Sequence, residues 1–420
     1  MPRKPAAKAA PPSVSTPFTL PNGTVVPNRL AKSAMSEALG GTDGRVTPAL
    51  VRLYARWAHS GLGLMMTGNV MIDRRALGEP GNVVIEDARD VPLLRDWARA
   101  GSAHGTPLWM QINHPGKQAI RGLNAETVAP SAVPFKPEMA RLFPTPRALN
   151  SDEIDGLITR YATTARIARQ AGFSGVQIHG AHGYLVSQFL SPHHNRRTDH
   201  WGGTPEKRRH FVHAVYAAMR AETGADFPIG IKLNSADFQR GGFSEDESLD
   251  TVLALAEAGV DLIEISGGNY EAPAMMLGNT KASTREREAY FLDFATTVRR
   301  HSKVPLMVTG GFRTAAGMNA ALADGGLDLM GLARLLAIEP DVPKRLLAGR
   351  DPEQVIRPIR TGIPMIDASG GMEVTWYTRQ LRRISAGRAP LPDESGLKSF
   401  LLDLPEKGLG IFRNRRLRAS

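Results

Sequence analysis

Short apolar runs alternate along the chain with longer amphipathic segments, and this alternation is the clearest pattern in the sequence. The apolar runs have the length of buried strands, whereas the segments between them have the length and spacing of helices. Eight such runs occur, at residues 29–35, 63–72, 107–114, 175–180, 229–234, 262–268, 305–311 and 327–334. The predicted helices lie at residues 48–60, 90–103, 152–172, 204–222, 245–259, 286–301 and 313–324. A repeated order of buried strand and helix is typical of a parallel sheet.

Eight strand–helix units predict an α/β protein with a closed (β/α)8 TIM barrel between residue 28 and about residue 349. The alternative is a doubly wound open sheet, but no G-x-G-x-x-G motif follows the first strand, so the dinucleotide fingerprint is missing. Asn22 and Gly23 lie between two short apolar arms, which predicts an N-terminal β-hairpin. Ser151 and Ser244 precede acidic residues, and we expect them to cap the helices that follow.

Two connections are too long for simple turns, and both follow the carboxyl end of a predicted strand. They span residues 114–150 and 181–203. Connections of this length are usually functional, and the carboxyl ends of barrel strands are where active sites form. Beyond the eighth unit we expect one more helix, at residues 375–387.

The formal net charge of +11 is concentrated at the two ends of the chain. Residues 1–14 contain three basic residues and no acidic one, and residues 407–420 contain five basic residues and no acidic one. We therefore expect a disordered basic tail at 1–14, a barrel at 15–349, and a C-terminal helical extension with a basic tail at 350–420. The tails carry no repeated aromatic residues of the kind that bind nucleic acid, so we expect no nucleic-acid partner.

The sequence has the composition of a globular protein that works away from membranes. No apolar run approaches the roughly 18 residues of a membrane span, and the N-terminal segment lacks the apolar core of a secretory signal. We therefore expect a cytoplasmic protein with no membrane partner. The chain of 420 residues contains no cysteine, which excludes disulfides, thiolate nucleophiles and cysteine-held zinc or iron–sulfur clusters.

The densest group of reactive residues lies at 179–203, which holds five histidines. One interpretation is a metal site made of His179, His182 and another histidine or Asp199, although H-x-x-H at a strand end lacks helical spacing. Surface or capping roles suit the other three, which are His193, His194 and His200. For His179 and His182 we favour a pair of hydrogen-bond donors to an anionic or carbonyl oxygen, with Tyr184 as a candidate proton donor.

Other candidates lie near the ends of further predicted strands. Gly310 and Gly311 follow the seventh run and Arg334 follows the eighth, where barrels usually bind phosphate. Lys232 has three interpretations: a Schiff-base lysine, a charge facing an electron-rich cofactor, or a core residue in an ion pair. Gln111 offers both a donor and an acceptor to an amide-like ring edge.

Several segments match one known family in order and spacing. They are NRLAKSAM (28–35), MQINHPGKQA (110–119), PSAVPF (130–135), the whole of 171–203, VTGG (308–311) and GLARLLAIEPD (331–341). Over roughly residues 15–345 the chain resembles the Old Yellow Enzyme family of FMN-dependent ene-reductases. The stretch 171–203 is the most specific of these matches.

The resemblance implies that FMN binds non-covalently at the carboxyl-terminal mouth of the barrel. The positions that match the family's FMN site are Ala34, Met35, Ser36, Asn69, Gln111, His179, Lys232, Gly310, Gly311, Ala333 and Arg334. Among them the glutamine would contact the pyrimidine edge, the lysine would stabilise the reduced flavin, and the glycines and arginine would hold the phosphate. His179 and His182 match the pair that holds the substrate oxygen, and Tyr184 matches the proton-donating tyrosine.

The implied activity is transfer of hydride from NAD(P)H to the activated C=C bond of α,β-unsaturated carbonyl compounds. We expect a small-molecule substrate, a homo-oligomer and no resident metal. Lys232 stands where most relatives have arginine, and Ala333 stands where most have glycine, which requires a negative φ there. The absence of cysteine excludes the relatives that carry an iron–sulfur cluster. The alternatives are a flavin-dependent oxidase or demethylase and, in a different class, a Schiff-base or metal-dependent barrel aldolase or isomerase.

Overall fold

The computed structural model describes residues 11–272, 291–363, 367 and 371–403. Parallel strands close into a barrel in the order β10-β11-β12-β13-β14-β3-β4-β7, and β7 pairs with β10 to complete the ring. The predicted TIM barrel is therefore confirmed. Its strands are β3 (Leu30–Lys32), β4 (Leu64–Met66), β7 (Leu108–Asn113), β10 (Gly175–Gly180), β11 (Ile229–Asn234), β12 (Leu262–Ser266), β13 (Leu306–Thr309) and β14 (Leu329–Leu332).

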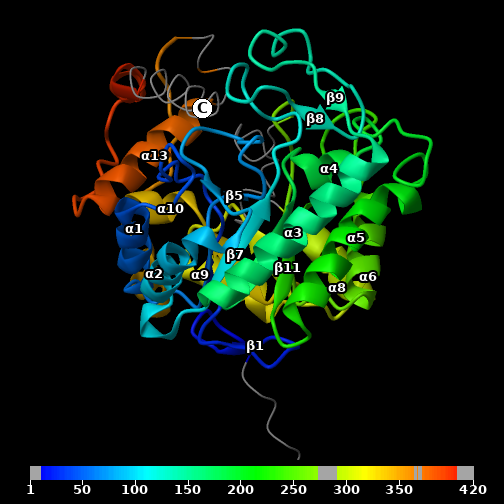
Figure 1. Cartoon of the computed structure of the whole chain (residues 1–420). Helices are drawn as coiled ribbons and strands as arrows, with labels where there is room; N and C mark the ends of the chain where they lie inside the picture. Colours follow the sequence, from blue (N-terminus) through cyan, green and yellow to red (C-terminus); the bar gives the residue numbers. More distant parts are fainter. Residues whose placement is uncertain (1–10, 273–290, 364–366, 368–370, 404–420) are drawn as a thin grey trace, which may run out of the picture.

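Helices surround the barrel and cover its outer face (Figure 1). Apolar side chains of the strands pack outward against them, including Ile112, Val176 and Ile231, none of which is exposed. The long outer helices are α1 (Pro48–Ala58), α2 (Val91–Gly101), α3 (Ser151–Ala171), α5 (Pro205–Thr223), α6 (Glu245–Glu257), α8 (Leu292–His301) and α9 (Ala315–Ala323). Shorter helical segments are α4 (Leu185–Leu190), α10 (Arg334–Ile338), α11 (Val342–Leu347) and the 3-10 turns η1 (Ala88–Asp90) and η2 (Ala103–Gly105). Residues 286–290 of the predicted helix 286–301 lie outside the described residues, and α8 begins at Leu292.

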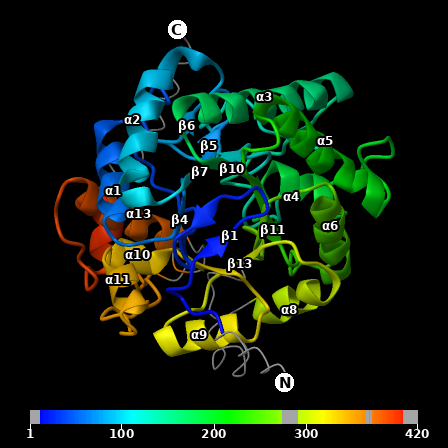
Figure 2. The same ribbon diagram turned by 90° about the horizontal axis from the view of Figure 1, so that it is seen from below.

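The predicted N-terminal hairpin closes the amino-terminal end of the barrel. Strands β1 (Phe18–Thr19) and β2 (Val25–Val26) pair antiparallel around a turn in which Gly23 has a φ of +87°. Leu20 and Val26 are buried with Trp109 and other residues of the barrel floor. Seen from below, β1 lies across the centre of the ring (Figure 2). Ligands can therefore reach the barrel interior from the opposite end, where the strands finish.

The predicted strand at 63–72 is two strands, and the break between them shapes the mouth of the barrel. β4 pairs with Leu108 and Trp109, whereas β5 (Val70–Met71) pairs with the later residues Ile112 and Asn113 of the same neighbour. β5 also pairs with β6 (Val83–Val84). The expectation of one continuous strand was wrong because the chain bends at Gly68, between Thr67, whose N–H still donates to Trp109 O at 2.9 Å, and the next pairing at Val70.

The N-terminal part of the chain joins the core earlier than predicted. Residues 1–10 of the expected tail lie outside the described residues, but Val14 is 3% exposed and its N–H donates to Asn319 Oδ1 at 2.9 Å. Val14, one residue before the expected start of the barrel, therefore packs with the barrel.

The C-terminal extension packs a helix on the outside of the barrel. Helix α13 (Gly371–Ser385) contacts α1 and α10, and Arg52 Nε of α1 donates to Ser385 O at 2.8 Å. Trp376 is 2% exposed, so it belongs to the core. Residues 404–420 of the predicted basic tail lie outside the described part. No described helix is both long and apolar enough to cross a membrane.

The cap of α3 is Asn150 instead of the expected Ser151. Asn150 Oδ1 accepts from Glu153 N at 2.8 Å, and Glu153 Oε2 accepts from Asn150 N at 2.9 Å, which forms a capping box. Ser244 caps α6 with Glu247 as predicted. We expect Asn150→Ala to lower the free energy of unfolding by about 1 kcal/mol in urea titrations. Ser151→Ala is the matched control, and an equal loss in both variants would contradict the assignment.

Candidate active site

Two histidines, His179 buried and His182 half-buried, form a hydrogen-bonded chain across the mouth of the barrel. His179 near the end of β10 is 4% exposed, and its Nδ1 lies 3.0 Å from Asn69 Oδ1 on the turn between β4 and β5. His179 Nε2 lies 3.3 Å from His182 Nδ1, and His182 Nε2 lies 2.8 Å from Ser266 Oγ at the end of β12. These hydrogen bonds therefore connect the ends of three strands and direct both imidazoles into the mouth of the barrel.

His182 has a backbone conformation that a histidine adopts at a cost. Its φ is +61°, in the left-handed region that favours glycine. Its N–H donates to Asn234 Oδ1 at 3.0 Å, and its backbone forms a bridge with Asn269. These contacts hold the residue in place, and strain of this kind is concentrated at functional sites.

Burial keeps both imidazoles neutral. The pKa of His179 and the pKa of His182 lie well below the ordinary value, mainly because burial disfavours the charged form. The positive charge of Lys232 lowers both pKa values further. A neutral imidazole has one N–H donor and one acceptor, so the pair can bind an oxygen without carrying charge.

Tyr184 lies beside this pair, at the start of α4. It is 8% exposed, and its ring centre is 4.7 Å from that of His179. Its hydroxyl oxygen lies 3.0 Å from that of Tyr270. Burial, together with the negative charge of Glu79, raises the pKa of Tyr184 well above its ordinary value. The hydroxyl therefore stays protonated and is available as a donor.

A chain of buried polar side chains lies deeper in the barrel. Lys232 Nζ and Glu264 Oε1 are 2.9 Å apart on the paired strands β11 and β12, with side chains 3% and 0% exposed. Glu264 Oε2 accepts from Gln177 Nε2 at 2.8 Å, and Gln177 Oε1 accepts from Gln111 Nε2 at 2.7 Å. Thr309 Oγ1 donates to Glu264 Oε1 at 2.6 Å. The ion-pair interpretation of Lys232 is thus confirmed, and a Schiff base would require this amine to leave its carboxylate.

The ends of β13 and β14 offer a cradle for an anion. Gly310 and Gly311 have φ values of +109° and +97°, a succession that lets backbone N–H groups converge on an anion. Ala333 has a φ of −133°, which is the negative φ that an alanine needs at this position. Arg334 Nη1 lies 3.5 Å from Glu373 Oε2 of α13, so the C-terminal extension helps to place this guanidinium. The donors suit a phosphate group.

The segment after β3 borders the same mouth. Ala34, Met35 and Ser36 are half-buried. A Cβ at Gly68 would lie 2.3 Å from Met35 O, so only glycine allows the turn after β4 to approach this segment so closely. The predicted site residues therefore lie at the carboxyl ends of the barrel strands or in the turns that follow them.

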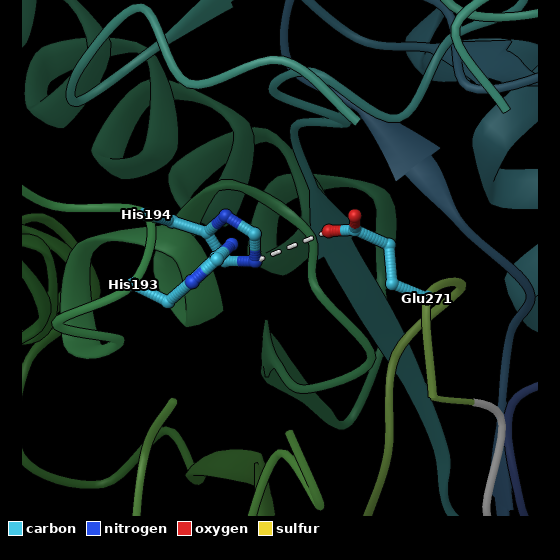
Figure 3. Close-up of side chains that lie close together, drawn as sticks. All are labelled: His193, His194 and Glu271. Atoms are coloured by element: carbon cyan, nitrogen blue, oxygen red, sulfur yellow. Dashed lines mark ion pairs between the residues drawn. The ribbon is translucent and has the colours of Figure 1, made fainter. Parts of the chain in front are cut away.

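The sequence-based metal hypothesis is not supported by the geometry. His182 is bonded to Ser266, whereas Asp199 pairs with Arg197 at 2.5 Å. Among the described residues a different group, His193, His194 and Glu271, has ligand atoms within 4.8 Å of one another (Figure 3).

This second group is better explained as a structural contact between loops. His194 is 3% exposed, so the expectation of a surface histidine was wrong, whereas His200 is exposed as expected. Glu271 Oε2 lies 3.3 Å from Lys117 Nζ, and Glu271 Oε1 accepts from Lys136 N at 3.0 Å. The carboxylate is already compensated by a cation. We call Glu271, Lys117 and His194 the loop clasp, because they join the segments 114–150 and 181–203 to the end of β12.

His114, the residue after β7, makes stability depend on pH. Burial lowers its pKa to about 4, whereas a histidine in an unfolded chain titrates near 6.5. Below about pH 6.5 the unfolded state binds a proton that the folded state excludes, so stability falls as the pH falls.

We expect this histidine to contribute a loss of about 2 kcal/mol between pH 7 and pH 5. His114→Asn keeps an acceptor for the Gly116 N–H, which is 3.1 Å from His114 Nδ1. In urea titrations at both pH values this variant should lose less stability than the parent. The same loss in parent and variant would refute the assignment.

Several residues of the site were missed by the sequence interpretation. Gln177 lies two residues before His179 and Glu264 lies two residues before Ser266, so each shares the inward face of its strand. Two polar residues separated by one position in an otherwise apolar strand were the signal that could have placed them in the site. Tyr270 follows β12 by four residues and carried no such signal.

These features define a barrel enzyme whose reactive groups lie at the carboxyl ends of the strands. Comparison with known proteins identifies the family. The chain belongs to the NADH:flavin oxidoreductase / NADH oxidase family, whose model matches residues 13–353. It is therefore an oxidoreductase of the flavin-dependent class, and the family implies FMN.

Individual relatives agree with this assignment. The chain is 36% identical over 401 residues to the NADH-dependent flavin oxidoreductase iccE of Talaromyces variabilis, covering 88% of this chain and 97% of that protein. It is 39% identical over 353 residues to the NADH-dependent flavin oxidoreductase iliE of Neonectria sp. (strain DH2). That match covers 78% of this chain and 46% of iliE, so this chain spans less than half of that relative.

A solved structure supports the fold. The Old Yellow Enzyme homologue from Zymomonas mobilis superposes with a TM-score of 0.69 at 22% identity, covering 84% of this chain and 96% of that chain. The resemblance to the Old Yellow Enzyme family is confirmed.

Proposed function

We propose that this protein is an FMN-dependent reductase that takes hydride from NADH and reduces a C=C bond conjugated to a carbonyl group. The observation that carries the proposal is the hydrogen-bonded pair His179 and His182 with the ring of Tyr184 beside it. NADH is the proposed donor because the two fungal relatives are named as NADH-dependent enzymes. A non-covalent FMN and a small-molecule substrate complete the proposal.

The donor set of the mouth fits FMN. Gly310, Gly311 and Arg334 would hold its phosphate, and Lys232 and Gln111 would face its ring. Gln111 uses one amide N–H on Gln177 and keeps its oxygen and second N–H for a ligand. Ala34, Met35, Ser36, Asn69 and Ala333 would line the rest of the site. When bound, FMN supplies the hydride chemistry, and the protein supplies orientation and electrostatics.

The histidine pair and Tyr184 have separate tasks in this proposal. His179 and His182 would donate to the substrate oxygen, where negative charge accumulates as hydride reaches the β-carbon. Each neutral imidazole has one N–H to donate, so the hydrogen bonds to Asn69, between the two rings and to Ser266 would rearrange when the substrate oxygen binds. Tyr184 would donate its proton to the α-carbon, and its raised pKa keeps that proton in place until then.

The test has two parts. Purified protein supplied with FMN should retain it after gel filtration and release it on denaturation, which absorbance measures. Stopped-flow mixing should then show reduction by NADH and reoxidation by an enone such as 2-cyclohexenone. Failure to retain FMN would refute the cofactor assignment, and retention without reoxidation by any of a panel of enones would refute the substrate class.

A further inference from the structure

Tyr270 contacts the proposed proton donor Tyr184. The residue before it, Asn269, is held in place by several hydrogen bonds. Asn269 Oδ1 accepts from the N–H groups of Glu271 and Ala272, both at 2.9 Å, and its Nδ2 donates to Gln239 Oε1 at 3.1 Å. Asn269 also pairs through its backbone with His182. The start of the segment after β12 is therefore tied to the strand end that carries the histidine pair.

Glu271, the residue after Tyr270, is also restrained. The side chain of Glu271 is 2% exposed and is bonded to Lys117 and to the N–H of Lys136 in the loop clasp. Tyr270 thus lies between two residues that are held by hydrogen bonds and an ion pair, so its backbone is restrained on both sides.

Tyr270 is more exposed than the Tyr184 side chain that it contacts. Its side chain is 37% exposed, whereas Tyr184 is 8% exposed. The two hydroxyl oxygens are 3.0 Å apart, and the ring centres are 6.1 Å apart. On its other side Tyr270 packs against Phe143, with ring centres 6.2 Å apart. Water can therefore reach Tyr270, which is in direct contact with Tyr184.

We propose that Tyr270 returns a proton to the hydroxyl of Tyr184 after each turnover. This inference rests on the proposed function, in which Tyr184 protonates the α-carbon. The substrate C=C bond gains hydride at one carbon and the Tyr184 proton at the other. The Tyr184 phenolate then takes the proton of the Tyr270 hydroxyl, and Tyr270 takes one from water, so that both tyrosines return to their starting state.

The surroundings of Tyr184 explain why such a return path is needed. Burial and the neighbouring Tyr270 and Glu79 raise the pKa of Tyr184, His179 beside it is neutral, and only a hydrogen bond from the side chain of Asn69 favours the phenolate. A buried phenolate without a cation nearby is costly and must be discharged quickly. A hydroxyl at hydrogen-bond distance provides the shortest route.

The test compares Tyr270→Phe with the parent and with Phe143→Leu, all loaded with FMN. Phe143→Leu alters the same aromatic wall but removes no hydroxyl, so it is the matched control. We measure single-turnover reoxidation of pre-reduced enzyme by an enone and steady-state turnover with NADH. Both are repeated with increasing imidazole at constant pH, because a small acid can replace a lost proton donor.

We expect Tyr270→Phe to lower steady-state turnover about tenfold or more, within the range that positioned proton donors contribute. Single-turnover reoxidation should stay within about twofold of the parent, because Tyr184 begins that reaction protonated. Imidazole should restore turnover in Tyr270→Phe and have no effect on the control. Parental turnover in Tyr270→Phe, or a loss that imidazole does not restore, would overturn the relay. If Tyr184→Phe itself reoxidises as fast as the parent, the proposed function fails instead.

Discussion

Tyr184→Phe should slow reoxidation of the reduced enzyme by an enone by about 10²–10⁴-fold. The variant keeps the ring that packs 4.7 Å from His179 and loses only the hydroxyl. Reduction by NADH requires no proton from this residue, so its rate should stay within about twofold of the parent rate. Stopped-flow absorbance of the flavin measures both half-reactions separately.

The control for this experiment is Tyr216→Phe, which removes a hydroxyl from the outer helix α5. It should leave both half-reactions unchanged. Equal slowing of the two half-reactions in Tyr184→Phe would mean that the substitution disturbs FMN binding, and it would contradict the assignment of Tyr184 as proton donor.

Lys232→Met should have the largest effect on stability, lowering the free energy of unfolding by about 3–5 kcal/mol. The substitution leaves Glu264, which is 0% exposed, without its cation. Adding Glu264→Gln removes the stranded charge while keeping an acceptor for Gln177. We expect the double variant to recover most of the loss in urea titrations.

A surface ion pair provides the comparison. Lys344 and Asp341 are 3.4 Å apart, with side chains 57% and 48% exposed. Lys344→Met should therefore change the free energy of unfolding by less than about 1 kcal/mol. A loss in Lys232→Met that matches the surface variant, or a double variant no more stable than the single, would show that the buried pair contributes little.

The strand–helix pattern predicted most of the fold because barrel strands are buried on both sides. Each of the eight apolar runs contains at least one strand of the described barrel. The predicted secondary structure was wrong at two places where polar contacts determine how an element begins or ends. The run 63–72 is broken because the Gln111 N–H donates to Thr67 Oγ1 at 2.9 Å. Asn150 displaced Ser151 as a cap through a capping box that depends on side-chain geometry.

The residues that the resemblance names lie near one another in the structure, but the hydrogen bonds that connect them were not predicted from the sequence. The resemblance supplied His179, His182 and Tyr184, and the structure places all three at the mouth. The alternation of polar residues could have drawn attention to Gln177 and Glu264, but their contacts with Gln111 and Lys232 come from pairing between strands, which the local sequence does not record. Their roles toward FMN remain proposals that the experiments above test.

The loop clasp has a consequence for how this enzyme can be changed. Glu271 belongs to one connection, Lys117 to a second and His194 to a third, so a change in one connection alters a contact of the others. Exchanging residues 114–150 alone for those of a relative would remove Lys117 and leave a buried carboxylate without its cation. A chimera intended to alter substrate preference should therefore transplant the three connections together.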